Sequence, residues 1–252
     1  MGGPARLDWL TAQGYAHRGL HGANEQGNVP ENSLAAFAAA MASGLGIECD
    51  VRKSSDGRAI VFHDDDLDRL TGQNGTVSDS TVGELTALRL VSTDQHIPTL
   101  RDVLSLVVGQ AALLLELKTD RSKPVTPLCR AVRRDLEGYA GPVAVMSFDP
   151  RVSSWFAQRQ PGLVRGLVVS EQNARTLSGS VKRRLAVLHA KPDFIACDVN
   201  DFPSRFADGQ VKRGRKLLSW TVRSAALLET AQTAGATPIL EAAGVAAWLS
   251  RA

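Results

Sequence analysis

Residues 46–51 read Gly46-Ile47-Glu48-Cys49-Asp50-Val51, a short apolar run that carries two acidic side chains. A run of this length and character is typical of a buried β-strand. Side chains alternate between the two faces of a strand, so Glu48 and Asp50 share one face while Cys49 points the other way. The run therefore predicts a core strand that presents two carboxylates on the same face.

A second strand of this kind is predicted at 113–117, where Glu116 and Lys118 are two residues apart and share a face. Other charged or titratable residues stand at the ends of further predicted strands. The groups that can then meet in one pocket are three carboxylates, two histidines, an arginine and a lysine: Glu48, Asp50, Glu116, His17, His63, Arg18 and Lys118. Such a set is suited to metal-assisted chemistry on a phosphate.

Around these runs, short apolar segments alternate with longer amphipathic ones. The predicted strands are 14–17, 46–51, 113–117, 143–147, 164–169, 194–199, 217–222 and 238–240. The predicted helices are 33–42, 100–108, 125–136, 151–159, 181–189, 225–234 and 242–249, with a less regular helical stretch after Asp201. This alternation predicts an α/β protein with a (β/α)8 TIM barrel. An open doubly wound sheet is the alternative, but no glycine-rich phosphate loop follows the first strand.

The 252 residues fit a single domain, 1–252. One segment, about 64–98, breaks the alternation, because it is rich in Asp, Thr, Ser and Gly and too long for an ordinary connection. We expect it to be a small insertion after the second strand that caps one side of the barrel mouth. The run Asp64-Asp65-Asp66 within it is expected to be a solvated turn rather than a second metal site.

The charge of the chain sets limits on its partners. Charged residues make up 22% of the chain and the net charge is +3, a mild surplus that suits an anionic substrate. Two basic clusters, 182–184 and 212–216, have no aromatic residues interleaved with them, and no nucleic-acid motif is present. They are therefore interpreted as solvated surface, with no nucleic-acid partner.

The three cysteines, Cys49, Cys129 and Cys197, are odd in number and widely spaced, which predicts reduced thiols rather than disulfides or a zinc site. The first residues show no signal-peptide pattern, and no apolar run is long enough to span a bilayer. We therefore expect a cytoplasmic protein without integral membrane association, unless a leader has been removed. The sequence does not indicate an oligomeric state.

Six motifs, in this order along the chain, resemble those of the glycerophosphodiester phosphodiesterase family. They are His17-Arg18-Gly19, residues 30–37, Glu48-Cys49-Asp50-Val51, residues 61–72, Glu116-Leu117-Lys118 and Trp220-Thr221-Val222. Each motif alone is weak, but the ordered set is specific and spans nearly the whole chain. The resemblance implies a barrel with a small insertion, a divalent cation, and hydrolysis of a small-molecule glycerophosphodiester to glycerol 3-phosphate and an alcohol.

Three acidic residues match the metal ligands of the family: Glu48, Asp50 and Glu116. Carboxylate oxygens are hard ligands, so this set suits one divalent cation, Mg²⁺ or Ca²⁺, better than a softer metal. The alternative for any one of them is a barrel residue paired with Arg or Lys. The segment Pro30-Glu31-Asn32 opens the first helix and is expected to be mainly architectural, with Asn32 orienting a group at a strand end.

The resemblance also implies roles for the remaining site residues. His17 and His63 match the acid/base pair, and we expect His17 to take the proton of an attacking glycerol hydroxyl while His63 protonates the leaving alcohol. The sequence does not fix that order. Arg18 and Lys118 match the residues that hold phosphate, and pairing with the carboxylates is a compatible second role. Trp220 is expected to line the pocket wall, with a core tryptophan as the alternative.

Two features depart from the common family pattern. The loop 20–29 is longer than the usual link and would reshape the mouth, and the last strand, 236–242, lacks the frequent Thr-Asp-x-Pro ending. Two alternative functions remain: a lysophospholipase D or sphingomyelinase-like phosphodiesterase acting on lipid headgroups, and a catalytically idle barrel that binds a phosphorylated ligand. The leaving alcohol, the acceptance of an acyl chain and the choice between Mg²⁺ and Ca²⁺ stay open.

Overall fold

The computed structural model describes residues 4–24, 27–172 and 174–251. Within these residues strands alternate with helices along the whole chain, and the expected (β/α)8 barrel fold is confirmed. Contacts divide the chain into two compact units. The N-terminal unit is Arg18–Pro142, and the C-terminal unit is Met1–His17 together with Val143–Ala252. A single domain over 1–252 stays a prediction.

Strand β4 (Gly46–Lys53) is the centre of the sheet in the N-terminal unit. It pairs in parallel with β6 (Leu113–Leu117) and antiparallel with β5 (Ala59–Val61). The strand β6 is buried along its whole length, as expected of a parallel strand that is covered on both faces. In the parallel register Asp50 lies opposite Glu116, so acidic residues from two strands become neighbours.

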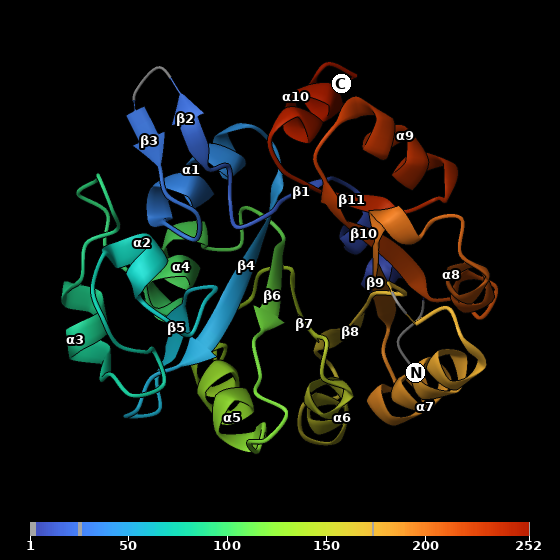
Figure 1. Ribbon diagram of the computed structural model, residues 1–252, viewed down its shortest axis with the longest axis horizontal. Helices are drawn as coiled ribbons and strands as arrows, with labels where there is room; N and C mark the ends of the chain where they lie inside the picture. The colour runs from blue at the N-terminus through green and yellow to red at the C-terminus, as the bar shows by residue number, and fades with distance from the viewer. Residues whose placement is uncertain (1–3, 25–26, 173, 252) are drawn as a thin grey trace. The chain divides into compact units, whose positions relative to one another are not determined.

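Three helices of the N-terminal unit match the sequence expectation within a residue or two at each end: α1 (Leu34–Ala42), α4 (Leu100–Val107) and α5 (Thr126–Asp135) (Figure 1). The cap of α1 is Ser33, whose Oγ accepts the N–H of Ala36 at 3.1 Å. A threonine, Thr99, caps α4 in a reciprocal arrangement with Asp102. In each cap the side-chain oxygen accepts a hydrogen bond from a backbone N–H that has no acceptor inside its helix.

The segment 64–98 contains two short helices, α2 (Asp68–Thr71) and α3 (Val82–Ala87), which lie beside β5 (Figure 1). It is anchored by an apolar cluster that includes the end of β5: Ile60, Phe62, Leu67, Val77, Leu85, Leu90 and Ile97. The segment is therefore packed onto the sheet of its own unit and carries its own small core.

A hairpin near the start of this unit was not expected from the sequence. The loop 20–29 forms an antiparallel hairpin of β2 (Gly22–Asn24) and β3 (Gly27–Val29). Its residues include two glycines and two asparagines and almost no β-branched side chains, so neither strand propensity nor an alternating pattern predicts it.

Among its described residues, the C-terminal unit holds six strands in the spatial order β1-β11-β10-β9-β8-β7. Their bounds are Tyr15–Ala16 for β1, Val143–Ser147 for β7, Val164–Val169 for β8, Phe194–Asp198 for β9, Lys216–Val222 for β10 and Thr237–Leu240 for β11. The pairings recorded between neighbours in this unit are parallel. Each strand lies within two residues of its predicted bounds, because short buried apolar runs between turns identify such strands well.

The helices of the C-terminal unit are η1 (Pro4–Thr11), α6 (Pro150–Arg159), α7 (Leu177–Ala190), η2 (Val199–Asp201), α8 (Arg205–Val211), α9 (Ala225–Thr233) and α10 (Ala243–Leu249). Helix α7 begins at Leu177, four residues before the expected start at Val181. Thr176 caps the helix, because its side chain accepts the N–H of Gly179 at 3.1 Å. The stretch after Asp201 is confirmed as helical by α8. Cys49, Cys129 and Cys197 are buried, and within the described residues none of the three forms a disulfide. In the described part of the chain, no helix is both long and apolar enough to cross a bilayer.

Candidate active site

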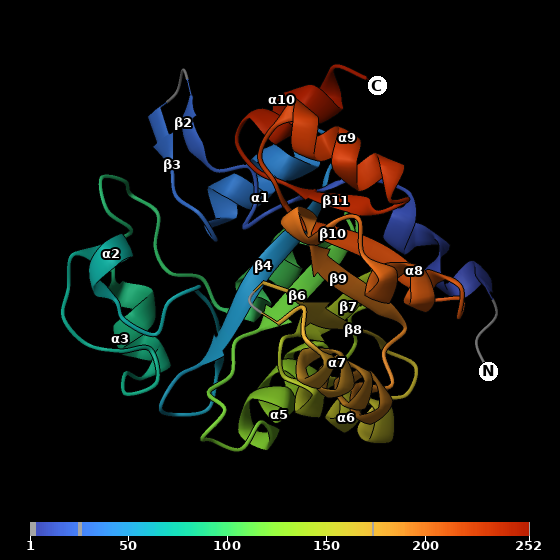
Figure 2. The ribbon, with the colours of Figure 1, turned by 45° about the vertical axis from the view of Figure 1, so that its right-hand side comes forward.

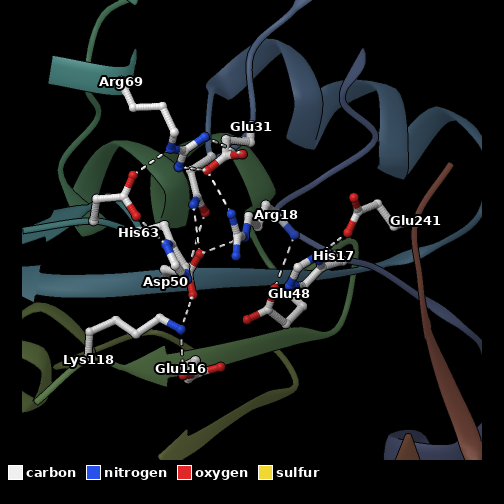
Figure 3. Close-up of polar contacts among 12 residues, drawn as sticks. His17, Arg18, Glu31, Glu48, Asp50, His63, Arg69, Glu116, Lys118 and Glu241 are labelled. Carbon is white, nitrogen blue, oxygen red and sulfur yellow. Dashed lines mark hydrogen bonds and ion pairs between the residues drawn. The ribbon is translucent and has the colours of Figure 1, made fainter. Parts of the chain in front are cut away.

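The three predicted metal ligands meet in the N-terminal unit. Glu48 and Asp50 come from one face of β4 and Glu116 from β6, and one oxygen of each lies within 4.8 Å of the others. All three side chains are buried. The alternation along β4 places the first two together, and the parallel register brings the third beside them. Figure 3 shows the three carboxylates on neighbouring strands.

Two cations contact this carboxylate cluster. The Lys118 Nζ lies 3.0 Å from Asp50 Oδ1 and 2.6 Å from Glu116 Oε1. The Arg18 Nε lies 3.2 Å from Asp50 Oδ2, and the Arg18 backbone N–H donates to Glu48 Oε2 at 3.0 Å. The pairing with the carboxylates that the sequence allowed for Arg18 and Lys118 is therefore present, and the phosphate role stays a prediction.

The backbone conformation at Arg18 brings this residue to the carboxylate cluster. Its φ is 57°, a left-handed conformation that is uncommon for a residue with a side chain, and its carbonyl accepts the N–H of Asn32 at 2.9 Å. The next residue, Gly19, has φ 78°, and a Cβ there would lie 2.8 Å from Ala36. Only glycine, which has no Cβ, allows the backbone to come this close to Ala36. This explains why the motif reads His17-Arg18-Gly19.

The pKa values of Glu48 and Asp50 shift in opposite directions. Burial raises the pKa of Glu48 well above its usual value, and the charges of Asp50 and Glu116 raise it further. Burial also acts to raise the pKa of Asp50, but Lys118 and Arg18 outweigh it and bring the pKa down to about 2. Three buried carboxylates beside two cations leave negative charge in a poorly solvated place, where an uncompensated charge is costly. Three carboxylate oxygens in such a place fit a hard divalent cation, whose charge would offset the cost of ionising Glu48.

His63, which follows β5, is oriented by acidic and basic neighbours. Its Nδ1 lies 2.7 Å from Asp64 Oδ1, and Arg69 Nε donates to the other Asp64 oxygen at 2.6 Å. Burial lowers the pKa of His63, and the attraction of Asp50 for its charged form does not reverse this. Burial thus favours the neutral ring, whereas Asp50 and the Asp64 contact at Nδ1 favour the imidazolium that a proton donor must form.

Arg69 links His63 to the phosphate-binding candidates through Glu31. The Arg69 Nη2 donates to Glu31 Oε1 at 2.7 Å, and the Arg18 Nη1 donates to the same oxygen at 2.8 Å. Sequence reasoning treated Glu31 as architectural and gave Arg69 no role. Figure 3 shows the chain of contacts. The one indication of this chain of contacts in the sequence is that all of its residues belong to the family motifs.

His17 belongs to the C-terminal unit, one peptide bond before Arg18. Its Nδ1 lies 2.7 Å from Glu241 Oε2, and its backbone N–H donates to the Leu240 carbonyl at 2.8 Å. Arg223 Nη2 donates to the same Glu241 oxygen at 3.0 Å. Sequence reasoning missed Glu241, although a carboxylate directly after the last strand was a usable signal, because barrels place functional groups at strand ends.

Trp220 lies in β10 and is partly buried. Its ring meets Phe148, which follows β7, edge to face with centroids 5.3 Å apart, and its Nε1 donates to the Ala196 carbonyl at 3.0 Å. The Phe148 side chain is exposed. Trp220 is thus not a fully buried core residue. Together with Phe148 it forms a partly exposed aromatic pair.

The sequence profile of the Glycerophosphoryl diester phosphodiesterase family matches residues 17–241, nearly the whole chain. The chain belongs to this family. The match begins at His17 and ends at Glu241, the two residues that contact each other through Nδ1 and a carboxylate oxygen. The resemblance stated from the motifs is confirmed.

Among curated members of the glycerophosphodiester phosphodiesterase family, the chain is 36% identical over 115 residues to an enzyme of that name from Bacillus altitudinis, covering 43% of this chain and 45% of that protein. It is 38% identical over 112 residues to one from Caldanaerobacter subterraneus subsp. tengcongensis, covering 41% and 44%. The chain spans less than half the length of these curated relatives.

Solved structures resemble the fold over most of its length. A phosphodiesterase of Oleispira antarctica, solved in complex with the product sn-glycerol-3-phosphate, has a TM-score of 0.80 at 24% identity, covering 94% of this chain and 96% of that one. A glycerophosphodiester phosphodiesterase of Thermotoga maritima has a TM-score of 0.72 at 24% identity, with the same coverage. At these identities the likeness shows the fold of the family.

Proposed function

We propose that the protein is a metal-dependent phosphodiesterase that hydrolyses a glycerophosphodiester to glycerol 3-phosphate and an alcohol. The observation that carries this proposal is the buried cluster of Glu48, Asp50 and Glu116 with Lys118 and Arg18 against it. Family membership supports it, as do the names of the curated relatives and the product that the Oleispira antarctica structure contains.

The same three carboxylates would hold one divalent cation, Mg²⁺ or Ca²⁺. When bound, such a cation supplies positive charge that polarises a phosphate oxygen and lowers the pKa of a hydroxyl beside it. Lys118 and Arg18 are proposed to add charge at the non-bridging oxygens, where Arg offers two N–H groups and Lys a point charge. Both side chains are mostly buried, which strengthens their attraction for a phosphate relative to that of surface cations.

Two histidines are proposed to move the protons. His17 accepts the proton of the glycerol 2-hydroxyl as that oxygen attacks phosphorus, and His63 donates a proton to the alcohol oxygen as its bond to phosphorus breaks. The product of this step is a cyclic glycerol phosphate and a free alcohol. A water then opens the ring: His63 takes the water proton, and His17 returns its proton to the 2-oxygen, which regenerates both groups.

The carboxylate partners of the histidines support these roles. Each imidazole meets a carboxylate at Nδ1, Glu241 for His17 and Asp64 for His63. A carboxylate at Nδ1 fixes the tautomer and stabilises the charged imidazolium that forms when the ring accepts a proton. Trp220 and Phe148 are proposed to pack against the carbon atoms of the substrate.

A turnover screen tests the proposal. The protein is incubated with glycerophosphocholine, glycerophosphoethanolamine, glycerophosphoglycerol or lysophosphatidylcholine, each with EDTA, Mg²⁺ or Ca²⁺, and released glycerol 3-phosphate and lysophosphatidic acid are measured. We expect glycerol 3-phosphate from at least one glycerophosphodiester, loss of turnover in EDTA and recovery with added metal. Turnover of lysophosphatidylcholine alone would favour the lipid-headgroup alternative, and full activity after exhaustive chelation would remove the metal from the mechanism.

A further inference from the structure

Helix α7 in the C-terminal unit exposes a row of apolar side chains. The α7 stripe consists of Leu177, Val181, Leu185 and Leu188, which are 89%, 54%, 59% and 70% exposed. At 3.6 residues per turn these four positions fall within an arc of about 80° on one side of the helix. Nine large apolar side chains are exposed among the described residues, and four of them form this one stripe.

The packing of α7 in its own unit does not use the stripe. The opposite side of the helix, which includes Val187 and Ala190, is buried in a cluster with Leu167 of β8 and Ile195 of β9. Figures 1 and 2 show α7 on the outside of the unit, next to α6. A surface helix normally carries one apolar face and one polar face. A second, contiguous apolar face on the solvent side is typical of a docking surface.

The charged side chains of helix α7 itself are all basic. Helix α7 contains Lys182, Arg183 and Arg184 but no Asp or Glu. A groove of about 920 Å³ between α7 and α8 is lined by Leu177, Leu188 and Phe206 together with Arg184, Arg205 and Arg213. Glu171 also lines this groove.

The carboxylate of Glu171 is already engaged. It accepts from Ser204 at 2.6 Å and lies 3.7 Å from the Arg183 Nη2. Within the described residues Lys182, Arg184 and Arg205 take part in no ion pair, so their charges are available to an external partner.

We propose that the α7 stripe and the basic groove beside it dock onto an anionic membrane surface. The leucines enter the boundary between headgroups and acyl chains, and Lys182, Arg184 and Arg205 meet lipid phosphates. Charge complementarity favours this partner over a second copy of the chain. In a symmetric dimer the same face meets itself, which would bring these basic side chains toward those of the other copy.

Vesicle sedimentation tests this docking without any substrate, so its result does not depend on the proposed catalytic function. The full chain is mixed with vesicles of phosphatidylcholine alone or of phosphatidylcholine with about one third phosphatidylglycerol, and bound protein is measured at low and high salt. We expect binding to the anionic vesicles that weakens as salt rises, and little binding to pure phosphatidylcholine.

Two double variants separate the contributions. Leu177→Gln with Leu188→Gln should lower the partition coefficient at least about tenfold, because two leucines leave the interface. Lys182→Glu with Arg184→Glu should abolish the preference for anionic vesicles. Matched controls are Leu249→Gln, an exposed leucine of α10, and Arg133→Glu, an exposed arginine of α5, both of which should bind like the wild type. Circular dichroism confirms that each variant is folded.

Three results would overturn the proposal. They are unchanged vesicle binding in the Leu177→Gln/Leu188→Gln variant, equal binding to neutral and anionic vesicles, and a dimer in analytical ultracentrifugation that the leucine variant dissociates. The last result would assign the stripe to contact between copies of the chain. Loss of binding in the stripe and charge variants, with both controls intact, would support docking on an anionic membrane.

Discussion

Asn32 and Asp50 exchange two hydrogen bonds in the N-terminal unit. The Asn32 Nδ2 donates to Asp50 Oδ2 at 2.9 Å, and the Asp50 backbone N–H donates to Asn32 Oδ1 at 3.2 Å. Both residues are buried, and Asn32 has a left-handed φ of 56°. Because the Asn32 N–H also donates to the Arg18 carbonyl, this one residue ties the loop that carries Arg18 to the strand that carries Asp50.

The variant Asn32→Ala should weaken metal affinity about 10–100-fold, the usual effect of removing a hydrogen-bond partner of a ligand. Without the amide, the Asp50 carboxylate loses the contact that fixes its orientation. Isothermal titration with Mg²⁺ or Ca²⁺ measures the change. Asn200→Ala is a matched control, since Asn200 Nδ2 donates to Asp198 Oδ1 at 2.9 Å outside the carboxylate cluster. Equal affinities in wild type and Asn32→Ala would mean that Asp50 does not bind the metal.

The carboxylates and the histidines should differ in a thermal-shift experiment. A ligand present at 100 times its Kd stabilises a protein by about 2.7 kcal/mol, which corresponds to a rise in Tm of roughly 5–10 °C for a chain of this size. Glu48→Gln, Asp50→Asn and Glu116→Gln should lose this metal-dependent rise.

His17→Ala and His63→Ala should keep the metal-dependent rise in Tm while kcat falls by roughly 10²–10⁴. If the two histidine variants lose the rise to the same extent as the carboxylate variants, the histidines are ligands rather than proton carriers.

The two histidines should respond differently to the leaving group. A p-nitrophenyl phosphodiester with a free glycerol hydroxyl releases a stabilised anion that needs little protonation. His63→Ala should therefore recover much of its rate on this substrate, whereas His17→Ala stays impaired because the attacking hydroxyl still lacks its base. Single-turnover release of p-nitrophenolate measures the rates of both variants. Recovery of His17→Ala instead would reverse the assignment of base and acid.

The contact between Glu241 and His17 should make stability depend on pH. The hydrogen bond from His17 is the largest cause that lowers the pKa of Glu241, which falls from 4.5 to about 2. A carboxylate with a lowered pKa stabilises the fold fully above its unfolded value, and this stabilisation is lost as pH falls through the folded value. The destabilisation caused by Glu241→Gln should therefore be largest above about pH 4.5 and shrink toward pH 2.

Urea unfolding of wild type and Glu241→Gln at pH 6, 4 and 2.5 measures this dependence. Glu229→Gln, in an exposed position of α9, serves as the control and should show no such trend. A destabilisation by Glu241→Gln that is the same at all three pH values would contradict a charged partner for His17.

Much of the site follows from local sequence. The alternation of side chains in 46–51 places Glu48 and Asp50 on one face whatever surrounds the strand, because this period belongs to the backbone itself. Strand and helix bounds follow in the same way from runs of apolar residues and from capping side chains such as Ser33. The family motifs then predict three metal ligands, and the structure does bring those three carboxylates together.

The contacts between distant segments were decided only by the tertiary structure. The register that sets Asp50 beside Glu116, the contact of His17 with Glu241 across 224 residues, and the link from His63 through Asp64 and Arg69 to Glu31 have no local pattern. The same holds for the α7 stripe, since a sequence with apolar residues on two sides of a helix does not say which side is buried. Local sequence patterns reflect backbone geometry within a few residues. These long-range contacts depend instead on how whole strands and helices pack against one another, and that packing is determined by the entire chain together.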